Sequence, residues 1–107
     1  MPQYDKLVRD RIPEIIKKEG KQLTVITLEE PEYLDQLDRK LKEELAEYLA
    51  SSDIQSQVEE LVDILEVIYA IAEAKGVSVQ ELETVRRKKA EKRGAFKGRV
   101  FLRWVED

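Results

Sequence analysis

Residues 54–75 read IQSQVEELVDILEVIYAIAEAK, and this stretch decides the fold. Its apolar side chains recur every three or four positions, a spacing that predicts a helix. Segment 61–72 is the most apolar part of the chain and leaves little of the helix circumference polar. Because a helix with so wide an apolar surface needs other helices to cover it, the sequence predicts a helical bundle.

Short polar segments separate this helix from its neighbours. Asp53 is a candidate N-cap, because its side chain can accept a hydrogen bond from a free backbone N–H group of the first turn. Gly76 follows the last apolar turn and ends the helix. Upstream, Pro31 opens a helix that runs to about residue 50 with its leucines on one face.

Two further helices are expected nearer the chain ends. Ser78, followed three residues later by Glu81, is typical of a capping box and predicts a helix over 79–93. A short helix is expected over 11–19, because Pro13 suits the first turn of a helix.

β-branched residues predict extended backbone in two segments, 22–28 and 100–105. We expect these segments to pair as a small two-stranded ribbon. The predicted fold is therefore all-α, a bundle of three main helices plus a short N-terminal helix, with this ribbon attached. No linker or repeat divides the chain, so a single helical domain is expected over residues 1–107.

The composition excludes several classes of site. The 107 residues include no cysteine and no histidine, which excludes disulfide scaffolds, thiolate or imidazole metal sites and Ser-His-Asp catalysis. Any metal must be held by oxygen, which favours Mg²⁺, Mn²⁺ or Ca²⁺. No stretch approaches the ~20 apolar residues of a membrane span, so we expect a cytoplasmic protein with no membrane partner.

Charge is unevenly distributed, although the net charge is only −4. Residues 29–83 contain sixteen acidic and four basic residues, whereas residues 84–107 contain nine basic and three acidic residues. One explanation is that these are solvated helix faces that keep the protein soluble. The other is an acidic centre that binds cations, beside basic ends that bind an anion.

The two central helices each carry a pair of carboxylates at i, i+3 spacing. Glu44 and Glu47 share one side of the first helix, and Glu60 and Asp63 share one side of the second. Glu60 projects from the middle of an apolar stripe, where an uncompensated charge is costly. These carboxylates could be peripheral or paired with Arg and Lys. Alternatively, they form a carboxylate cage for divalent cations, as facing helices of a bundle can do.

The sequence resembles the all-α nucleoside triphosphate pyrophosphohydrolases, the MazG-like superfamily. The resemblance starts from Glu43-Glu44-x-x-Glu47, followed after twelve residues by Glu60-x-x-Asp63. The opening segment 4–16, YDKLVRDRIPEII, and the closing segments 92–96, KRGAF, and 100–102, VFL, resemble one branch of it. That branch contains predicted house-cleaning pyrophosphatases of non-standard nucleotides, related to phosphoribosyl-ATP pyrophosphohydrolase. Ala95 stands where the branch has a second glycine.

This resemblance implies a magnesium-dependent enzyme. The positions that match the family's magnesium and catalytic residues are Glu44, Glu47, Glu60 and Asp63. Mn²⁺ would be an alternative metal. The implied reaction cleaves the α–β linkage of a nucleoside triphosphate and releases pyrophosphate and a nucleoside monophosphate. Glu43 belongs to the motif but points about 100° away from Glu44, so it would either support the metal ligands from behind or lie on the surface.

Basic residues are needed to meet the charge of such a substrate. The candidates at the two ends of the chain are Lys6, Arg9, Lys89, Lys92 and Arg93. The last three share one side of the final helix at i, i+3, i+4 spacing. They could also be a solvated basic face at a helix C-terminus, where the dipole favours cations. Arg9 could instead form a structural ion pair with Asp10.

A non-enzymatic function is the alternative. The basic final helix could belong to a dimeric helical interaction module that contacts nucleic acid. The acidic middle of the chain would repel a phosphate backbone, so nucleic acid is not the partner we expect. The apolar segment 61–72 exceeds what two other full-length helices can cover, and we therefore expect a homodimer or homotetramer.

Overall fold

The computed structural model describes residues 5–107 and is built from helices alone. The helices are α1 (Ile12–Lys18), α2 (Glu30–Ala50), α3 (Ile54–Ala74) and α4 (Val79–Arg93). Their bounds agree with the helices expected from the sequence to within two residues at each end. The prediction of an all-α fold with three main helices and a short N-terminal helix is confirmed.

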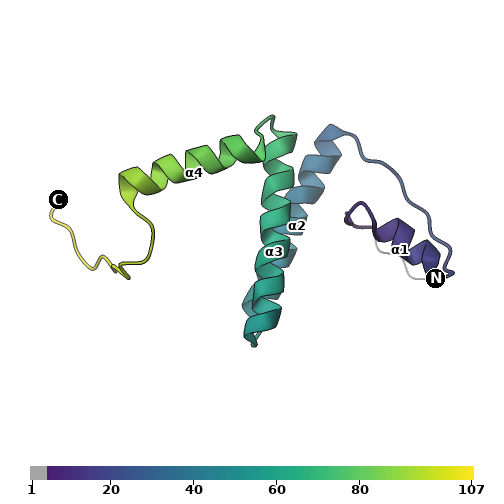
Figure 1. Ribbon diagram of the computed structural model, residues 1–107, viewed down its shortest axis with the longest axis horizontal. Helices are drawn as coiled ribbons and strands as arrows, with labels where there is room; N and C mark the ends of the chain where they lie inside the picture. Colours follow the sequence, from purple (N-terminus) through teal and green to yellow (C-terminus); the bar gives the residue numbers. More distant parts are fainter. Residues whose placement is uncertain (1–4) are drawn as a thin grey trace.

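Helices α2 and α3 form an antiparallel hairpin that carries the buried part of the molecule (Figure 1). Leu37 on α2 and Val67 and Ala72 on α3 are its buried apolar side chains, with Leu37 only 3% exposed. A local hydrogen bond stabilises the short connection between α2 and α3. The Asp53 carboxylate accepts a hydrogen bond from the backbone N–H of Ser56 at 3.0 Å, as expected for an N-cap.

Helix α4 leaves the end of this hairpin at a steep angle (Figure 1). Gly76 provides the turn with a φ of +85°, a conformation that glycine adopts without strain. The predicted capping box is present, because the Ser78 hydroxyl accepts from the backbone N–H of Glu81 at 3.1 Å and contacts its carboxylate. Helix α4 contacts α3 but not α2.

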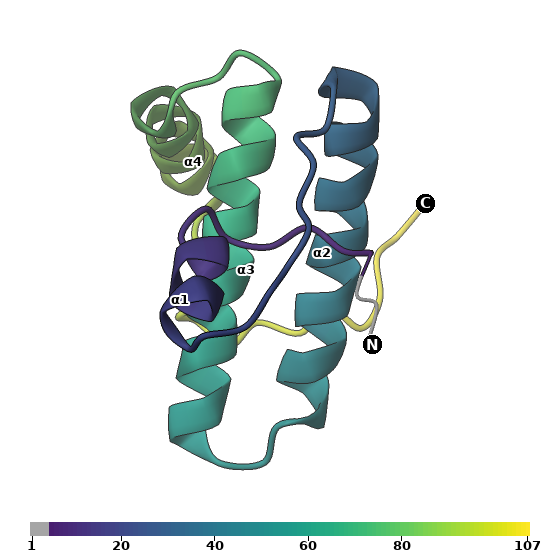
Figure 2. The same ribbon diagram turned by 90° about the vertical axis from the view of Figure 1, so that its right-hand side faces the viewer.

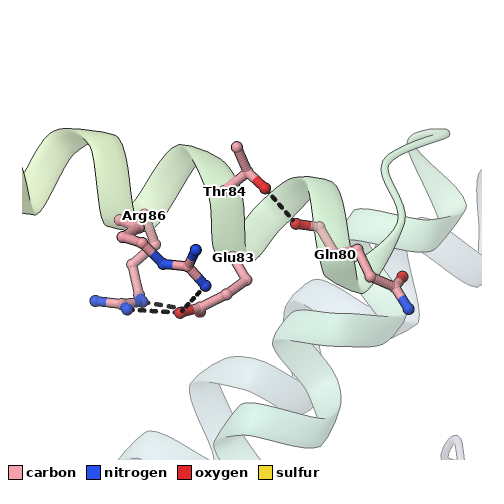
Figure 3. Close-up of polar contacts among 5 residues, drawn as sticks. Gln80, Glu83, Thr84 and Arg86 are labelled. Atoms are coloured by element: carbon pink, nitrogen blue, oxygen red, sulfur yellow. Dashed lines mark hydrogen bonds and ion pairs between the residues drawn. The ribbon is translucent and has the colours of Figure 1, made fainter.

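A groove of about 250 Å³ lies where α4 crosses α3. Glu83 and Arg86 line its α4 side. Arg86 donates two hydrogen bonds to the Glu83 carboxylate, at 2.6 and 2.9 Å (Figure 3). Its lining is otherwise mostly apolar and comprises Leu65, Ile68, Tyr69 and Leu82. None of these residues belongs to the carboxylate pairs described above, so the groove is separate from them.

An ion pair ties the segment before α1 to the hairpin. The Arg9 guanidinium lies 2.6 Å from the Asp63 carboxylate on α3. In the second view, α1 lies in front of the hairpin, and an extended stretch leads from it to α2 (Figure 2).

The predicted ribbon is wrong, because neither 22–28 nor 100–105 forms a strand in the structure. A ladder needs a neighbouring strand, and the two segments lie on opposite sides of the hairpin (Figure 1). Segment 22–28 connects α1 to α2, while α4 carries segment 100–105 away in the other direction. The β-branched side chains therefore specify extended backbone without supplying a partner.

This single chain leaves much of its surface exposed. Its radius of gyration is 18.3 Å, against about 13 Å for a compact chain of this length. It exposes 10144 Å², whereas a compact protein of this mass exposes roughly 6,200 Å². No helix within residues 5–107 is long and apolar enough to cross a membrane.

Candidate metal centre

Three carboxylates from α2 and α3 converge on the hairpin. One oxygen from each of Glu44, Glu47 and Glu60 lies within 4.8 Å of the other two. Glu44 and Glu47 are one turn apart on α2, and the antiparallel pairing of the helices brings Glu60 of α3 against them. We call these three residues the acidic cluster.

The acidic cluster extends into the buried part of the hairpin. Glu44 is 7% exposed and is therefore a buried charged residue, whereas Glu47 is exposed and Glu60 is half-buried. The Oε2 atoms of Glu44 and Glu60 are buried and have no hydrogen-bond partner among residues 5–107. A buried oxygen without a donor costs about 1–3 kcal/mol, and more when it is charged. Both atoms therefore require a positive ligand or a proton.

The ammonium group of Lys40 faces the acidic cluster. Lys40, one turn before Glu44 on α2, places its Nζ 3.6 Å from Glu44 Oε1, and both side chains are largely buried. The i, i+4 spacing of Lys40 and Glu44 was present in the sequence and could have identified this partner. A single lysine does not neutralise three carboxylates.

Repulsion and burial change the proton affinity of the cluster. Burial raises the pKa of Glu44, and the carboxyl groups of Glu60 and Asp63 raise it further, against the lowering effects of Glu47 and Lys40. The pKa of Glu47 is also raised, first by the neighbouring Glu44 carboxyl group and then by burial. These directions are those expected where carboxylates crowd together in the absence of a cation.

Asp63, the fourth predicted ligand, lies outside the acidic cluster. Its carboxylate is paired with Arg9, and its charge still acts on Glu44. Arg9 therefore contacts Asp63 rather than the neighbouring Asp10, and it docks the N-terminal segment on α3. This contact joins residues 54 positions apart, so helical spacing could not have revealed it. Glu43 is half-buried and is not part of the acidic cluster.

The predicted cationic residues lie on segments other than the two helices that carry the acidic cluster. Lys6 is exposed in the segment before α1. Lys89, Lys92 and Arg93 are exposed on the outer half of α4, which contacts α3 alone. Lys92 is thirteen residues beyond the start of α4, which corresponds to roughly 20 Å of helix.

Comparison with known proteins identifies the family of this chain. The sequence profile of the phosphoribosyl-ATP pyrophosphohydrolase family matches residues 5–90. The chain belongs to this family. The match includes the acidic cluster, Asp63 and Arg9, and it ends before Lys92 and the C-terminal segment. Members of the family, which lies in the MazG-like all-α superfamily, typically depend on a divalent metal.

Among individual proteins, the chain is similar to an uncharacterized protein from Mycolicibacterium smegmatis. The two are 51% identical over 45 residues, which is 42% of this chain and 46% of the relative. The match thus spans less than half of the relative's length. No solved structure matches the chain.

The donor set fits a hard divalent cation. The acidic cluster offers only carboxylate oxygens, which Mg²⁺ and Mn²⁺ prefer over softer ligands. The two unpartnered buried oxygens are the atoms that such a cation would satisfy. The members of the cluster come from two rigid helices, which hold them in place without a loop.

Proposed function

We propose that this protein is a magnesium-dependent nucleoside triphosphate pyrophosphohydrolase that removes non-standard nucleotides from the cytoplasmic pool. It would cleave the α–β linkage and release pyrophosphate and a nucleoside monophosphate. Membership of a family of pyrophosphohydrolases supports this reaction class. In this proposal, residues 1–107 form one helical domain, and Mn²⁺ is an alternative metal to Mg²⁺.

The observation that carries the proposal is the acidic cluster with its two unpartnered buried oxygens. The carboxylate oxygens of a solvated acidic face would contact water, and Glu44 would not be buried. An ordinary structural ion pair would supply a cation to each carboxylate. Within residues 5–107, however, Lys40 pairs with Glu44 Oε1, and the buried Oε2 atoms of Glu44 and Glu60 have no hydrogen-bond partner. Both alternatives considered from the sequence therefore account for the cluster less well than a metal site does.

Different residues would bind the metal and the substrate. Glu44, Glu47 and Glu60 would hold the cation as ionised carboxylates, with Asp63 available as a fourth ligand when Arg9 releases it. When bound, Mg²⁺ supplies Lewis-acid polarisation of phosphate oxygens and lowers the pKa of a water molecule. Lys40 would keep Glu44 ionised and oriented while the cation is absent.

Positive side chains would neutralise the triphosphate. Arg9 is already at the edge of the site through Asp63, and it could transfer from this carboxylate to a phosphate oxygen. Lys6 lies three residues earlier in the same segment. Lys89, Lys92 and Arg93 would have to arrive from a second copy, because α4 leads them away from their own hairpin. This requirement supports the proposed homodimer or homotetramer.

Pyrophosphate release from a panel of canonical and modified nucleoside triphosphates tests the proposal. We expect hydrolysis with Mg²⁺ or Mn²⁺ and none with a chelator, and we expect a nucleoside monophosphate as the second product. Release of inorganic phosphate and a diphosphate would show a different bond specificity and would contradict the proposed reaction. No hydrolysis of any nucleotide, together with binding to DNA or RNA, would favour the interaction module instead.

A further inference from the structure

Lys40 and Arg9 both pair with carboxylates at the candidate metal centre, but they are attached in different ways. Lys40 belongs to α2 and lies one turn from Glu44, so it stays beside that carboxylate while the helix is intact. Arg9 belongs to the segment before α1 and reaches Asp63 across 54 positions of sequence. The pair that Lys40 makes is largely buried, whereas the side chains of Arg9 and Asp63 are 54% and 37% exposed. The Arg9 pair is therefore the more accessible to water and to ions.

Asp63 is close to the acidic cluster but is turned to Arg9. It lies one turn after Glu60 on α3, on the same side of the helix. Its Oδ1 atom accepts a hydrogen bond from Arg9 at 2.6 Å, and Asp63 is not among the residues whose oxygens converge in the acidic cluster. Burial is the main cause of the raised pKa of Glu44, and the charge of Asp63 raises this pKa further. Asp63 thus already acts on the cluster, and it has to turn from Arg9 to become a ligand.

The backbone of Arg9 is joined to the start of α1. Its carbonyl oxygen accepts a hydrogen bond from the backbone N–H of Ile12 at 3.0 Å. Within residues 5–107, α1 packs against no other helix and has no buried residue. It stands apart from the hairpin, on the side opposite α4 (Figure 1). Release of Arg9 from Asp63 would therefore free α1 together with the segment that precedes it.

Arg9 and a divalent cation repel each other at a shared carboxylate. Both are positive, and the Coulomb energy of two charges is largest at separations of a few ångströms. The cation carries the larger charge and gains the carboxylates of the acidic cluster as further ligands. Arg9 is held by a half-exposed carboxylate, and exposed ion pairs are weak. The balance between the two therefore favours the cation.

We propose that Arg9 competes with the divalent cation for Asp63. Without metal, the guanidinium neutralises Asp63 and docks the N-terminal segment, residues 5–18, on α3. When the cation binds, Arg9 leaves Asp63, and the N-terminal segment is released with its positive charge free to meet a phosphate group. This proposal deepens the proposed function and rests on its metal site.

Competition gives Arg9 an effect on metal binding that a purely structural residue would not have. By reciprocal linkage, the factor by which docking weakens metal binding is also the factor by which the metal weakens docking. An exposed ion pair changes an equilibrium constant by up to about fivefold. Arg9→Gln should therefore tighten Mg²⁺ binding by about two- to fivefold. A residue that only supported the fold would leave the affinity unchanged or weaken it.

Isothermal titration calorimetry with Mg²⁺ measures this change. Arg11→Gln is the matched control, because it removes the same charge from the same segment. Arg11 is exposed and pairs with Glu14 of α1 instead of with the hairpin. We expect tighter binding from Arg9→Gln and the wild-type affinity from Arg11→Gln. Equal tightening by both variants would show a general effect of charge and would overturn the competition, as would an unchanged or weaker affinity of Arg9→Gln.

The side-chain NMR signal of Arg9 reports the displacement without any measurement of activity. The guanidinium Nε–H resonance is assigned by its absence from the spectrum of Arg9→Gln. Metal-free Asp63→Asn, which lacks the charged partner, gives the position of this resonance for a released Arg9. We expect saturating Mg²⁺ to move the wild-type resonance to that position, together with the backbone amide signals of the N-terminal segment.

The two experiments also separate this proposal from the proposed function. Mg²⁺ binding with an unchanged Arg9 resonance would overturn the competition alone, because Asp63 would then bind both partners or stay outside the site. No Mg²⁺ binding in calorimetry would contradict the metal site and would overturn both proposals. Mg²⁺ binding and release of Arg9 without hydrolysis of any nucleotide would support the competition and contradict the proposed reaction.

Discussion

The α2–α3 hairpin and the C-terminal third of the chain use their side chains in opposite ways. The hairpin buries Leu37 and Val67 and encloses a carboxylate, Glu44. Helix α4 has no buried residue, and every position after residue 90 is exposed. Both regions nevertheless form helices of fifteen residues or more with well-defined ends.

The difference shows that a helix and a site have separate requirements. Helix α4 begins where a local capping box satisfies its free N–H groups, and no tertiary contact is needed to define that end. The acidic cluster needs two helices held side by side, because Glu60 meets Glu44 and Glu47 only across the hairpin. The following experiments test this contrast, from the largest expected effect to the smallest.

The largest effect is expected from neutralising a member of the acidic cluster. Glu60→Gln should lower kcat by about two to four orders of magnitude, because the loss of one ligand impairs the stabilisation of transition-state charge. We expect a similar loss of kcat from Glu44→Gln, Glu47→Gln and Asp63→Asn. Glu59→Gln is the matched control, since Glu59 is the exposed neighbour of Glu60 on α3. Equal rates for the Glu59 and Glu60 variants would assign the cluster to an ordinary solvated face.

The two regions should also differ in their response to truncation of an apolar side chain. Leu37→Ala should destabilise the protein by about 2–5 kcal/mol, because it leaves a cavity in the hairpin. Val85→Ala on α4, where the side chain is mostly exposed, should change the free energy of unfolding by about 0.5 kcal/mol or less. Urea denaturation measures both. A large loss from Val85→Ala would show that α4 is covered in solution.

Magnesium should stabilise the hairpin through the acidic cluster. At a hundredfold excess over Kd, a ligand specific for the folded state adds about 2.7 kcal/mol. The melting temperature should then rise by roughly 10 °C or more. Glu60→Gln should melt higher than wild type without metal, because one repelling charge is gone, and should gain less from Mg²⁺. Glu59→Gln should show neither change, and an identical response of the two variants would count against a metal site.

The smallest effect is a pH dependence of the metal-free protein. The pKa of Glu44 is raised in the folded state, so the folded chain binds this proton more tightly than the unfolded chain does. Protonation of Glu44 therefore stabilises the folded state at pH values below 4.5, the ordinary pKa of a glutamate. This stabilisation is lost as the pH rises through the raised pKa. The difference in melting temperature between wild type and Glu44→Gln, measured with chelator from pH 4 to 8, should follow this trend. A constant difference would contradict the raised pKa.

Two other carboxylates change the pH dependence of stability in the opposite direction. Comparing wild type with Glu44→Gln removes their contribution. Hydrogen bonds from Ser56 lower the pKa of Asp53, and Arg86 lowers that of Glu83. Their stabilising contributions are present above the ordinary pKa values and are lost as the pH falls. Glu44→Gln leaves both groups unchanged, so the difference between the two proteins isolates the cluster.

The helices could be predicted from the sequence because their determinants are local. Asp53 and Ser78 each cap a helix through a group three residues away, and Gly76 ends a helix through its own backbone conformation. The i, i+3 spacing likewise placed Glu44 and Glu47 on one face. These relations are set within one turn of helix, where the sequence fixes the distance between groups.

Only the tertiary structure decided which charges meet. It brought Glu60 to Glu44 and Glu47, assigned Asp63 to Arg9, and left segments 22–28 and 100–105 without a partner strand. It also directed α4, which carries the predicted substrate-binding residues Lys92 and Arg93, away from the hairpin. Each of these outcomes depends on how separate elements pack against one another. Packing is determined by the sum of many weak contacts between distant segments, which the spacing of residues along a single helix does not contain.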